Sequence, residues 1–237
     1  LHHSLLSPYM NNGLLHAEEV VAAVVDAYKK KQAPIESVEA FVRQVIGWRE
    51  YVNGMYWFLG EEYRNRNALN ANRKLLPLYT DSSKTKMNCV RSVVQDVEAR
   101  SWTHHIPRLM VLSNLALTTG TNPQEFLNWM REQFIDASDW VMVPNVYGMT
   151  QFADGGMMST KPYISGSNYL MKMGNYEKGA WQATWDGLFW HFMDKQRNFF
   201  LSNPRLGMLI HTFDKMPLEK REAHLINAQN YLDSLDV

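Results

Sequence analysis

The clearest pattern along the chain is the return of apolar residues every three or four positions, which is typical of amphipathic helices. Residues 17–31 (AEEVVAAVVDAYKKK) show it, with acidic side chains in the first turn and lysines in the last, as the helix dipole favours. Residues 36–59 repeat the same spacing. We therefore predict two long helices in the N-terminal part of the chain.

The same spacing predicts four more helices downstream, over residues 90–118, 123–135, 181–201 and 217–235. Pro123 follows Asn122, a favourable N-cap with proline at the first helical position. Segments rich in Gly, Pro, Ser and Asn are predicted to be loops, at 70–88, 144–168 and 203–216. No alternating pattern typical of strands stands out, so we predict an all-α fold, a helical bundle forming a single domain over residues 1–237.

Composition narrows the functional classes. Hydrophobic residues make up 46% of the 237 residues, enough to bury a sizeable core. The 24 Lys and Arg balance 24 Asp and Glu, so net charge does not favour bulk nucleic-acid binding, although a local basic face would suffice. No apolar run reaches the ~18 residues of a membrane span. Cys89 is the single cysteine, which excludes a disulfide or a four-cysteine metal site within the chain and fits a reducing, cytoplasmic compartment.

The stretch RSWTHHIPRLM, residues 100–110, holds the most suggestive polar cluster. His104 and His105 each lie within helical reach of Arg108, but neighbouring helical residues point about 100° apart, which disfavours a shared metal ion. No HExxH motif is present, and neither a GxGxxG nor a phosphate-loop motif occurs. Two structural histidines and an acid–base pair both remain open from these residues alone.

Several segments taken together resemble one family. RSWTHHIPRLMVLSNLAL, with MNCVRS upstream and DWVMVPNVYGMTQFADGG downstream, is similar to the C-terminal flavin domain of the photolyase–cryptochrome superfamily, and within it to bacterial proteins that repair (6-4) photoproducts. Four further segments agree: HSLLSPYMNNGLL, FVRQVIGWREYV, KPYISGSNYLMKM and FFLSNPRLGMLIHTF. The resemblance covers roughly residues 3–216, and its combination of segments is specific although each segment alone is weak.

The resemblance implies an FAD site. HSLLS corresponds to the turn that holds the pyrophosphate, which implies contacts from Ser4, Leu6 and Ser7. Further cofactor contacts are implied for Trp48, Arg49, His104, Arg108 and Asn145. Arg108 corresponds to an arginine that pairs with an acid beside the flavin ring, and either Asp136 or Asp139 could be that acid.

The resemblance also implies a reaction and a substrate. His105 corresponds to the histidine placed over a (6-4) lesion as proton donor, with His104 beside it as the residue that orients it. Glu50, Tyr147, Met149 and Tyr163 are expected to face the lesion or DNA. Electron transfer to the flavin is expected through Trp129, with Trp102 and Trp140 as alternatives and Tyr79 as the aromatic nearest the usual position upstream of MNC.

Two departures from the family pattern change the expectations. Related proteins with an iron–sulfur cluster use four cysteines, whereas residues 174–186 contain none and only Cys89 remains, so we expect no cluster and no other metal. Trp181 and Trp185 are expected to fill that region instead. The family's N-terminal α/β antenna domain is absent from these 237 residues, so we expect a short form without an antenna chromophore.

The sequence thus predicts a light-driven, FAD-dependent DNA repair lyase, a monomer in the bacterial cytoplasm that acts on UV-damaged DNA, including single-stranded DNA. The alternatives are a cryptochrome-like flavoprotein without repair activity, a photolyase for cyclobutane dimers, and a helical binding module without flavin.

Overall fold

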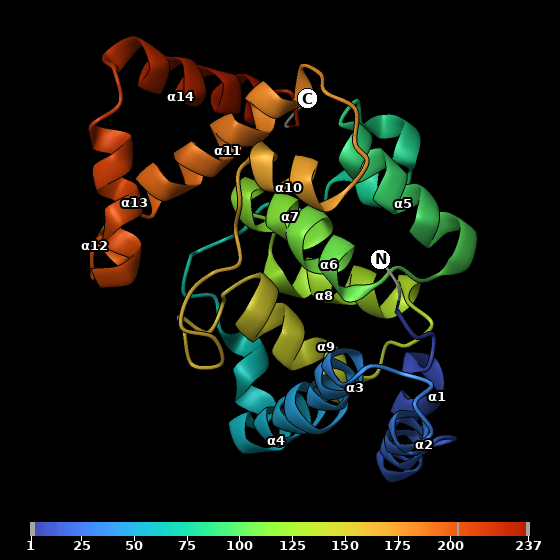
Figure 1. The fold of residues 1–237 in the computed structure, drawn as a ribbon. Coiled ribbons are helices and arrows are strands. Elements are labelled where there is room, and N and C mark those ends of the chain that lie inside the picture. The colour runs from blue at the N-terminus through green and yellow to red at the C-terminus, as the bar shows by residue number, and fades with distance from the viewer. Residues whose placement is uncertain (1–2, 203, 236–237) are drawn as a thin grey trace.

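The computed structural model describes residues 3–202 and 204–235, and it is built from helices (Figure 1). Within these residues the only strand-like pairing is one isolated parallel bridge between Arg73 and Thr121. The predicted all-α class is confirmed. No helix in the described ranges is both long and apolar enough to cross a membrane.

The N-terminal helices form much as the apolar pattern predicts. They are α1 (Ser7–Asn11), α2 (Ala17–Lys29), α3 (Ile35–Val42), η1 (Arg43–Arg49) and α4 (Glu50–Leu59). A capping box starts α2, because the Glu19 carboxylate accepts a hydrogen bond from the backbone N–H of His16 at 3.0 Å. The last three helices follow one another directly, and η1 is a π-helical segment within that run.

Short 3-10 turns interrupt the irregular segment after α4. They are η2 (Glu61–Asn65), η3 (Pro77–Tyr79) and η4 (Ser82–Lys84). Most of the predicted loop 70–88 is therefore irregular, as expected, with two of these turns inside it.

The predicted single helix over residues 90–118 is wrong. The chain forms α5 (Asn88–Arg100), breaks, and then continues through α6 (His105–Pro107), η5 (Arg108–Ser113) and α7 (Asn114–Thr119). Ser101 adopts a left-handed conformation with φ of 51°, which ends α5. His104 then acts as N-cap of the next helix, and Pro107 lies in its first turn, where no backbone donor is needed.

Two of the predicted loops are also partly helical. Beyond α8 (Pro123–Gln133) and α9 (Asp139–Pro144), the π-helical segment η6 (Asn145–Thr150) occupies the start of the predicted loop 144–168. Pro144 has a helical φ of −65°, so it permits this continuation. The predicted loop 203–216 is largely α13 (Pro204–Asp214).

The C-terminal part consists of α10 (Ser167–Met173), α11 (Trp181–Lys195), α12 (Arg197–Ser202), α13 and α14 (Leu218–Asp233). Figure 1 shows α11 and α14 side by side at one end of the molecule and α1–α4 at the other. A Cβ built on Gly187 of α11 would lie 2.7 Å from a backbone oxygen of α14, so the two helices approach closely because this residue is glycine.

The main hydrophobic core lies between these two ends. It joins α5, η5, α7, α8, η6 and α11, while smaller clusters lie beneath α12 and α13 and between α1, α2 and η1. Trp181 and Trp185 are buried in the main core, as predicted, and Cys89 is fully buried there too. Burial raises the pKa of the Cys89 thiol to about 12.

Candidate functional site

The centre of the candidate site is a buried ion pair between Arg108, at the start of η5, and Asp136, in the turn before α9. The guanidinium donates to both carboxylate oxygens, with Nη1 to Oδ1 at 2.8 Å and Nη2 to Oδ2 at 3.0 Å. The exposed fractions of the two side chains are 13% and 6%. Arg108 Nε also donates to the carbonyl oxygen of Thr103 at 2.6 Å. A bidentate pair of this kind fixes the guanidinium plane.

Helix α1 connects this pair to the N-terminal segment. Ser7 Oγ donates to Asp136 Oδ2 at 2.7 Å, and Asn11 Nδ2 donates to the backbone oxygen of Asp136 at 2.9 Å. Trp102 Nε1 in turn donates to Ser7 Oγ at 3.3 Å. Ser7, predicted as a phosphate contact, is therefore bound to the carboxylate in this structure. Ser4 is exposed and Leu6 is half-buried beside it.

The two predicted catalytic histidines occupy the start of the helix that carries Arg108. His104 Nδ1 accepts a hydrogen bond from the backbone N–H of Ile106 at 3.2 Å, so its ring caps the helix. The ring of His3 lies between Trp102 and His104, with centroid distances of 4.8 and 5.0 Å. This hydrogen bond joins the His104 ring to the backbone of the helix's first turn, which also carries His105.

His105 is exposed to solvent at the start of this helix, although partial burial still removes some hydration from its ring. Desolvation lowers its pKa to about 4, and the nearby Arg108 cation and His104 act in the same direction. Desolvation also lowers the pKa of His104, with His3 and Arg108 contributing. Both rings are therefore predominantly neutral at neutral pH in this ligand-free structure.

A second predicted cluster lies across α1 from the ion pair. The Arg49 guanidinium, at the end of η1, lies 5.0 Å from the ring centroid of Trp140 and donates to the backbone oxygen of Met10 at 3.4 Å. It also pairs with the adjacent carboxylate of Glu50. The Nε of Arg49 is buried without a hydrogen-bond partner. Trp48 is 44% exposed, so its ring is open to contact.

The structure separates the two acids that the sequence left open. Asp139 is 35% exposed and pairs with Arg64 and Arg131, at 3.0 Å each, whereas Asp136 pairs with Arg108. Asn145 begins η6, where its Nδ2 donates to the backbone oxygen of Val141 at 2.8 Å.

Three π-helical segments occur in the described part of the chain, and each carries residues predicted to bind cofactor. η1 ends with Trp48 and Arg49, η5 begins with Arg108, and η6 begins with Asn145. Such segments are rare and occur frequently at functional sites.

The predicted lesion contacts are less well placed. Tyr147 and Met149 are only 1% and 3% exposed and belong to the main core. The Tyr147 hydroxyl donates to Gln124 Oε1 at 3.1 Å. In this structure the two residues contribute to packing rather than to an open surface, while Tyr163 is half-buried.

Comparisons with known proteins place this chain in a family. The chain is 39% identical to a (6-4) photolyase of Agrobacterium fabrum over an alignment of 246 positions that covers 100% of this chain and 48% of that protein. The chain belongs to the photolyase–cryptochrome superfamily. It spans about half the length of that relative, so the relative's whole activity does not transfer with the family. No family model matches the chain.

Two uncharacterised proteins of Acanthamoeba polyphaga mimivirus also resemble parts of this superfamily member. One is 44% identical over 85 residues, covering 35% of this chain and 69% of the viral protein. The other is 34% identical over 74 residues, covering 31% of this chain and 57% of the viral protein.

Of the three tryptophans predicted to carry electrons, Trp102 lies beside the ion pair, whereas Trp140 lies beside Arg49. Trp102 and Phe134 flank the Arg108 guanidinium, which lies 5.6 and 4.2 Å from their ring centroids. Trp129 is buried behind Phe134, with ring centroids 5.7 Å apart, and lies 4.9 Å from Tyr79. Tyr79, which the sequence offered as the nearest available aromatic, is thus in contact with Trp129.

One site residue was missed because no local signal marks it: Phe134 follows the end of α8, outside every segment quoted for the resemblance. Asn11 lies within the quoted segment HSLLSPYMNNGLL, but nothing in that segment indicates its hydrogen bond to Asp136. Both contact the Arg108–Asp136 pair only because α1 and the turn after α8 fold against η5.

The arrangement fits an FAD molecule in its chemistry. An arginine–carboxylate pair, an orphaned Arg49 Nε, an exposed Ser4 hydroxyl and an open indole at Trp48 supply cationic, hydrogen-bonding and stacking groups. No group of three or more His, Cys, Asp or Glu side chains close enough to hold a metal ion occurs in the described ranges.

Proposed function

We propose that this protein is a light-driven, FAD-dependent DNA repair lyase that acts on (6-4) photoproducts. The observation that carries the proposal is the Arg108–Asp136 pair at the base of the helix that begins with His104 and His105. The same helical turn therefore carries Arg108, which is proposed to contact the cofactor, and the two histidines, which are proposed to act at the substrate. The (6-4) photolyase of Agrobacterium fabrum, aligned over the whole chain, supports the same assignment.

The cofactor would be held by residues from four elements. Ser4, Leu6 and Ser7 are proposed to hold the pyrophosphate, and Trp48 and Arg49 to contact the flavin from η1. Arg108, paired with Asp136, and Asn145 would lie beside the flavin ring. Bound and reduced, FAD supplies a light-excited one-electron donor. Arg108 and Asp136 would stabilise charge on the flavin because their hydrogen-bonded pair is already oriented.

His105 is proposed to donate a proton to the lesion and to recover it afterwards. The donor form of the ring is the imidazolium, whereas its lowered pKa of about 4 keeps it neutral in the free protein at pH 7. An anionic group within about 4–6 Å favours the imidazolium. A phosphate of bound DNA is such a group, so we propose that substrate binding raises the pKa of His105.

His104 is proposed to act as a positioning residue. Its Nδ1 cap on the Ile106 N–H holds the first turn of the helix, and with it the backbone at His105. Substitution of His104 should therefore affect His105 through orientation, which a pH–rate profile separates from loss of the donor itself.

The substrate is proposed to be UV-damaged DNA, with the lesion turned out of the stack to reach the site. A damaged, poorly stacked base costs less to extrude than an intact one, which contributes to selectivity. Single-stranded DNA lowers this cost further. Glu50, which is exposed beside Arg49, and the half-buried Tyr163 are proposed contacts to the lesion or the DNA. Electrons are proposed to reach the flavin through Tyr79 and Trp129, with Trp102 and Trp140 as alternatives.

The deciding experiment combines flavin spectra with repair assays. The protein should be loaded with FAD, reduced and illuminated with oligonucleotides carrying one (6-4) photoproduct or one cyclobutane dimer, each single- and double-stranded. Light-dependent restoration of the (6-4) oligonucleotide is expected. His105→Ala should abolish it with flavin still bound, whereas His211→Ala, an exposed histidine on α13, should not.

The same experiment separates the rival functions. Repair of the cyclobutane dimer alone would identify a different photolyase. Bound flavin without repair of either lesion would indicate a cryptochrome-like role. A protein that binds no flavin would contradict the proposal altogether.

A further inference from the structure

The side chain of Asn11, at the end of α1, contacts the turn that carries Asp136. Asn11 Nδ2 donates to the backbone oxygen of Asp136 at 2.9 Å, and the Asn11 side chain is half-buried there. No backbone N–H in the described part of the chain donates to this oxygen. Asp136 is buried, and a buried carbonyl group is costly without a hydrogen bond. Asn11 therefore supplies the hydrogen bond that the backbone of the turn does not make.

Two contacts from other elements hold the backbone of this turn. The backbone N–H of Ile135 donates to the carbonyl oxygen of Ser101, at the end of α5, at 2.9 Å. One residue later, Asn11 holds the carbonyl group of Asp136 from α1. Loss of the second contact would release the peptide group that directly follows the Asp136 Cα. The position of the Asp136 carboxylate therefore depends on the amide of Asn11.

Arg108 is held independently of that amide. Its Nε donates to the carbonyl oxygen of Thr103 at 2.6 Å, within its own stretch of chain. Asp136, by contrast, is held from α1 at both its backbone and its side chain, because Ser7 Oγ donates to its Oδ2 at 2.7 Å. A change in α1 would therefore move the carboxylate relative to the guanidinium rather than move the two together.

We propose that Asn11 is a positioning residue for the cofactor site, which acts by holding the Asp136 carboxylate in place opposite Arg108. This role rests on the proposed function in one respect, because it assumes that the Arg108–Asp136 pair lies beside bound FAD. Asn11 itself does not touch the cofactor in this role. Its loss should weaken FAD binding only through the ion pair, since a site binds best when its contacting groups are already oriented.

The first test measures the ion pair in the protein without FAD. Asn11→Leu removes the amide donor, nearly preserves the size of the side chain and adds no charge. Asn12→Leu is the matched control, because Asn12 is exposed and accepts a hydrogen bond from the backbone N–H of Leu14 at 3.1 Å instead. NMR would follow hydrogen exchange of the Arg108 guanidinium protons, which the bidentate pair should protect from solvent.

Asn11→Leu should speed this exchange at least roughly tenfold, about the effect of one lost hydrogen bond, whereas Asn12→Leu should change it by less than about twofold. Gly187→Ala controls for a general loss of stability, because it disturbs the contact between α11 and α14 at the other end of the molecule (Figure 1). It should leave the exchange of the Arg108 protons unchanged.

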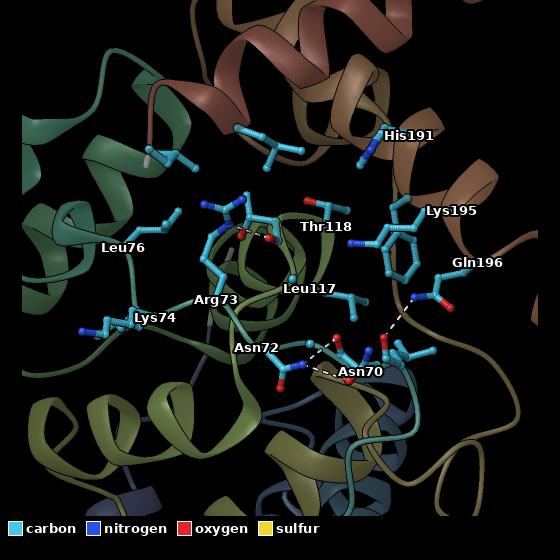
Figure 2. A pocket seen from close by; sticks show the side chains of 18 of the residues that line it. Asn70, Asn72, Arg73, Lys74, Leu76, Leu117, Thr118, His191, Lys195 and Gln196 are labelled. Carbon is cyan, nitrogen blue, oxygen red and sulfur yellow. Dashed lines mark hydrogen bonds between the residues drawn. The ribbon is translucent and has the colours of Figure 1, made fainter. Parts of the chain in front are cut away.

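The second test is titration with FAD, followed by flavin fluorescence. Asn11→Leu and Asp136→Asn should each raise the dissociation constant for FAD. The double variant should match Asp136→Asn alone within about twofold, because two changes that act through one group are not additive. Lys195 lines a separate cavity of about 640 Å³, walled by the segment 69–77 and by parts of α7, α11 and α14 (Figure 2). Lys195→Met should leave the affinity for FAD unchanged.

Two results would overturn the positioning role. One is a wild-type rate of Arg108 proton exchange in Asn11→Leu. The other is a double variant in which the two losses of affinity multiply, because Asn11 would then act on the cofactor independently of Asp136. If Asp136→Asn does not fold, the exchange rates of Asn11→Leu and Asn12→Leu decide the question by themselves.

Failure of the proposed function would give a different pattern. The wild-type protein would bind no FAD, or its binding would be lost in Lys195→Met and retained in Arg108→Met, which would place the cofactor in the separate cavity. Either result would overturn the cofactor part of the role. The exchange rates are measured without FAD, so they would still show whether Asn11 holds the Arg108–Asp136 pair.

Discussion

The buried ion pair allows a prediction whose size follows from the structure. Asp136→Asn removes the negative charge opposite Arg108 while nearly preserving the size of the side chain. Asp136 is 6% exposed and accepts two hydrogen bonds from Arg108 and one from Ser7. The guanidinium, itself 13% exposed, would be left buried without its counter-charge. Breaking one partner of such a pair costs about 3–5 kcal/mol in the free energy of unfolding.

That loss should be visible in melting experiments. For a domain of this size about 1 kcal/mol corresponds to roughly 2–4 °C, so the midpoint should fall by roughly 6–20 °C. Urea unfolding followed by circular dichroism would give the free energy directly. Under the proposed function, the variant should also retain less FAD after gel filtration.

Asp139→Asn is the matched control. Asp139 is 35% exposed and pairs with Arg64 and Arg131, so solvent screens the interactions and the expected loss is only about 0.2–1 kcal/mol. If Asp136→Asn costs less than about 1 kcal/mol, or no more than Asp139→Asn, the argument that burial makes the first pair structurally decisive is wrong.

Three other predictions test separate parts of the structure. NMR titration of His105 should give a pKa of about 4 rather than 6.5. Between these two values the unfolded state binds more protons than the folded state, so the stability contributed by neutral His105 should be fully present above pH 6.5 and should decline as pH falls toward 4. The slope of the free energy of unfolding against pH should therefore be smaller in His105→Gln. In chemical denaturation, Gly187→Ala should lower the free energy of unfolding by about 1–3 kcal/mol, because the added Cβ meets the α14 backbone. Gly54→Ala is the control: Gly54 lies in α4 with open space around it, so alanine should raise the free energy of unfolding by up to about 1 kcal/mol. Tyr79→Phe removes a 2.7 Å hydrogen bond to the buried carbonyl of Leu112, which should cost about 1–3 kcal/mol in the free energy of unfolding. If electrons pass from Tyr79 to Trp129, the same variant, loaded with flavin, should show slower photoreduction by absorbance, and an unchanged rate would exclude that route.

Helices with complete local signals were predicted well. Residues 17–29 have acids at the start and a lysine at the end, and residues 123–133 begin with an Asn–Pro start. These signals act within one or two helical turns, so they can be recognised from the sequence alone. The segment 203–216 was predicted as a loop because Asn, Pro and Gly occur in it, yet α13 forms there and buries Leu206, Ile210 and Phe213 against its neighbours.

The predicted helix over 90–118 was wrong for a related reason. Its apolar period continues across the break, so the pattern alone does not reveal that Ser101 turns left-handed. That break is what exposes the first turn with His104 and His105, and it allows Trp102 to contact Ser7. The candidate site therefore depends on an interruption that hydrophobic periodicity does not encode.

By itself, the sequence determined the all-α class, most of the helices, the family resemblance and the residue types of the site, because each of these depends on local composition, spacing or motif. It left Asp136 and Asp139 as equal candidates for the partner of Arg108, since both are acids in the same short segment. Only the tertiary structure decided between them. The chain folds α1 against the turn after α8, which buries Asp136 beside Arg108 and leaves Asp139 at the surface with Arg64 and Arg131. Contacts between segments so far apart in the chain arise from packing, which no local pattern records.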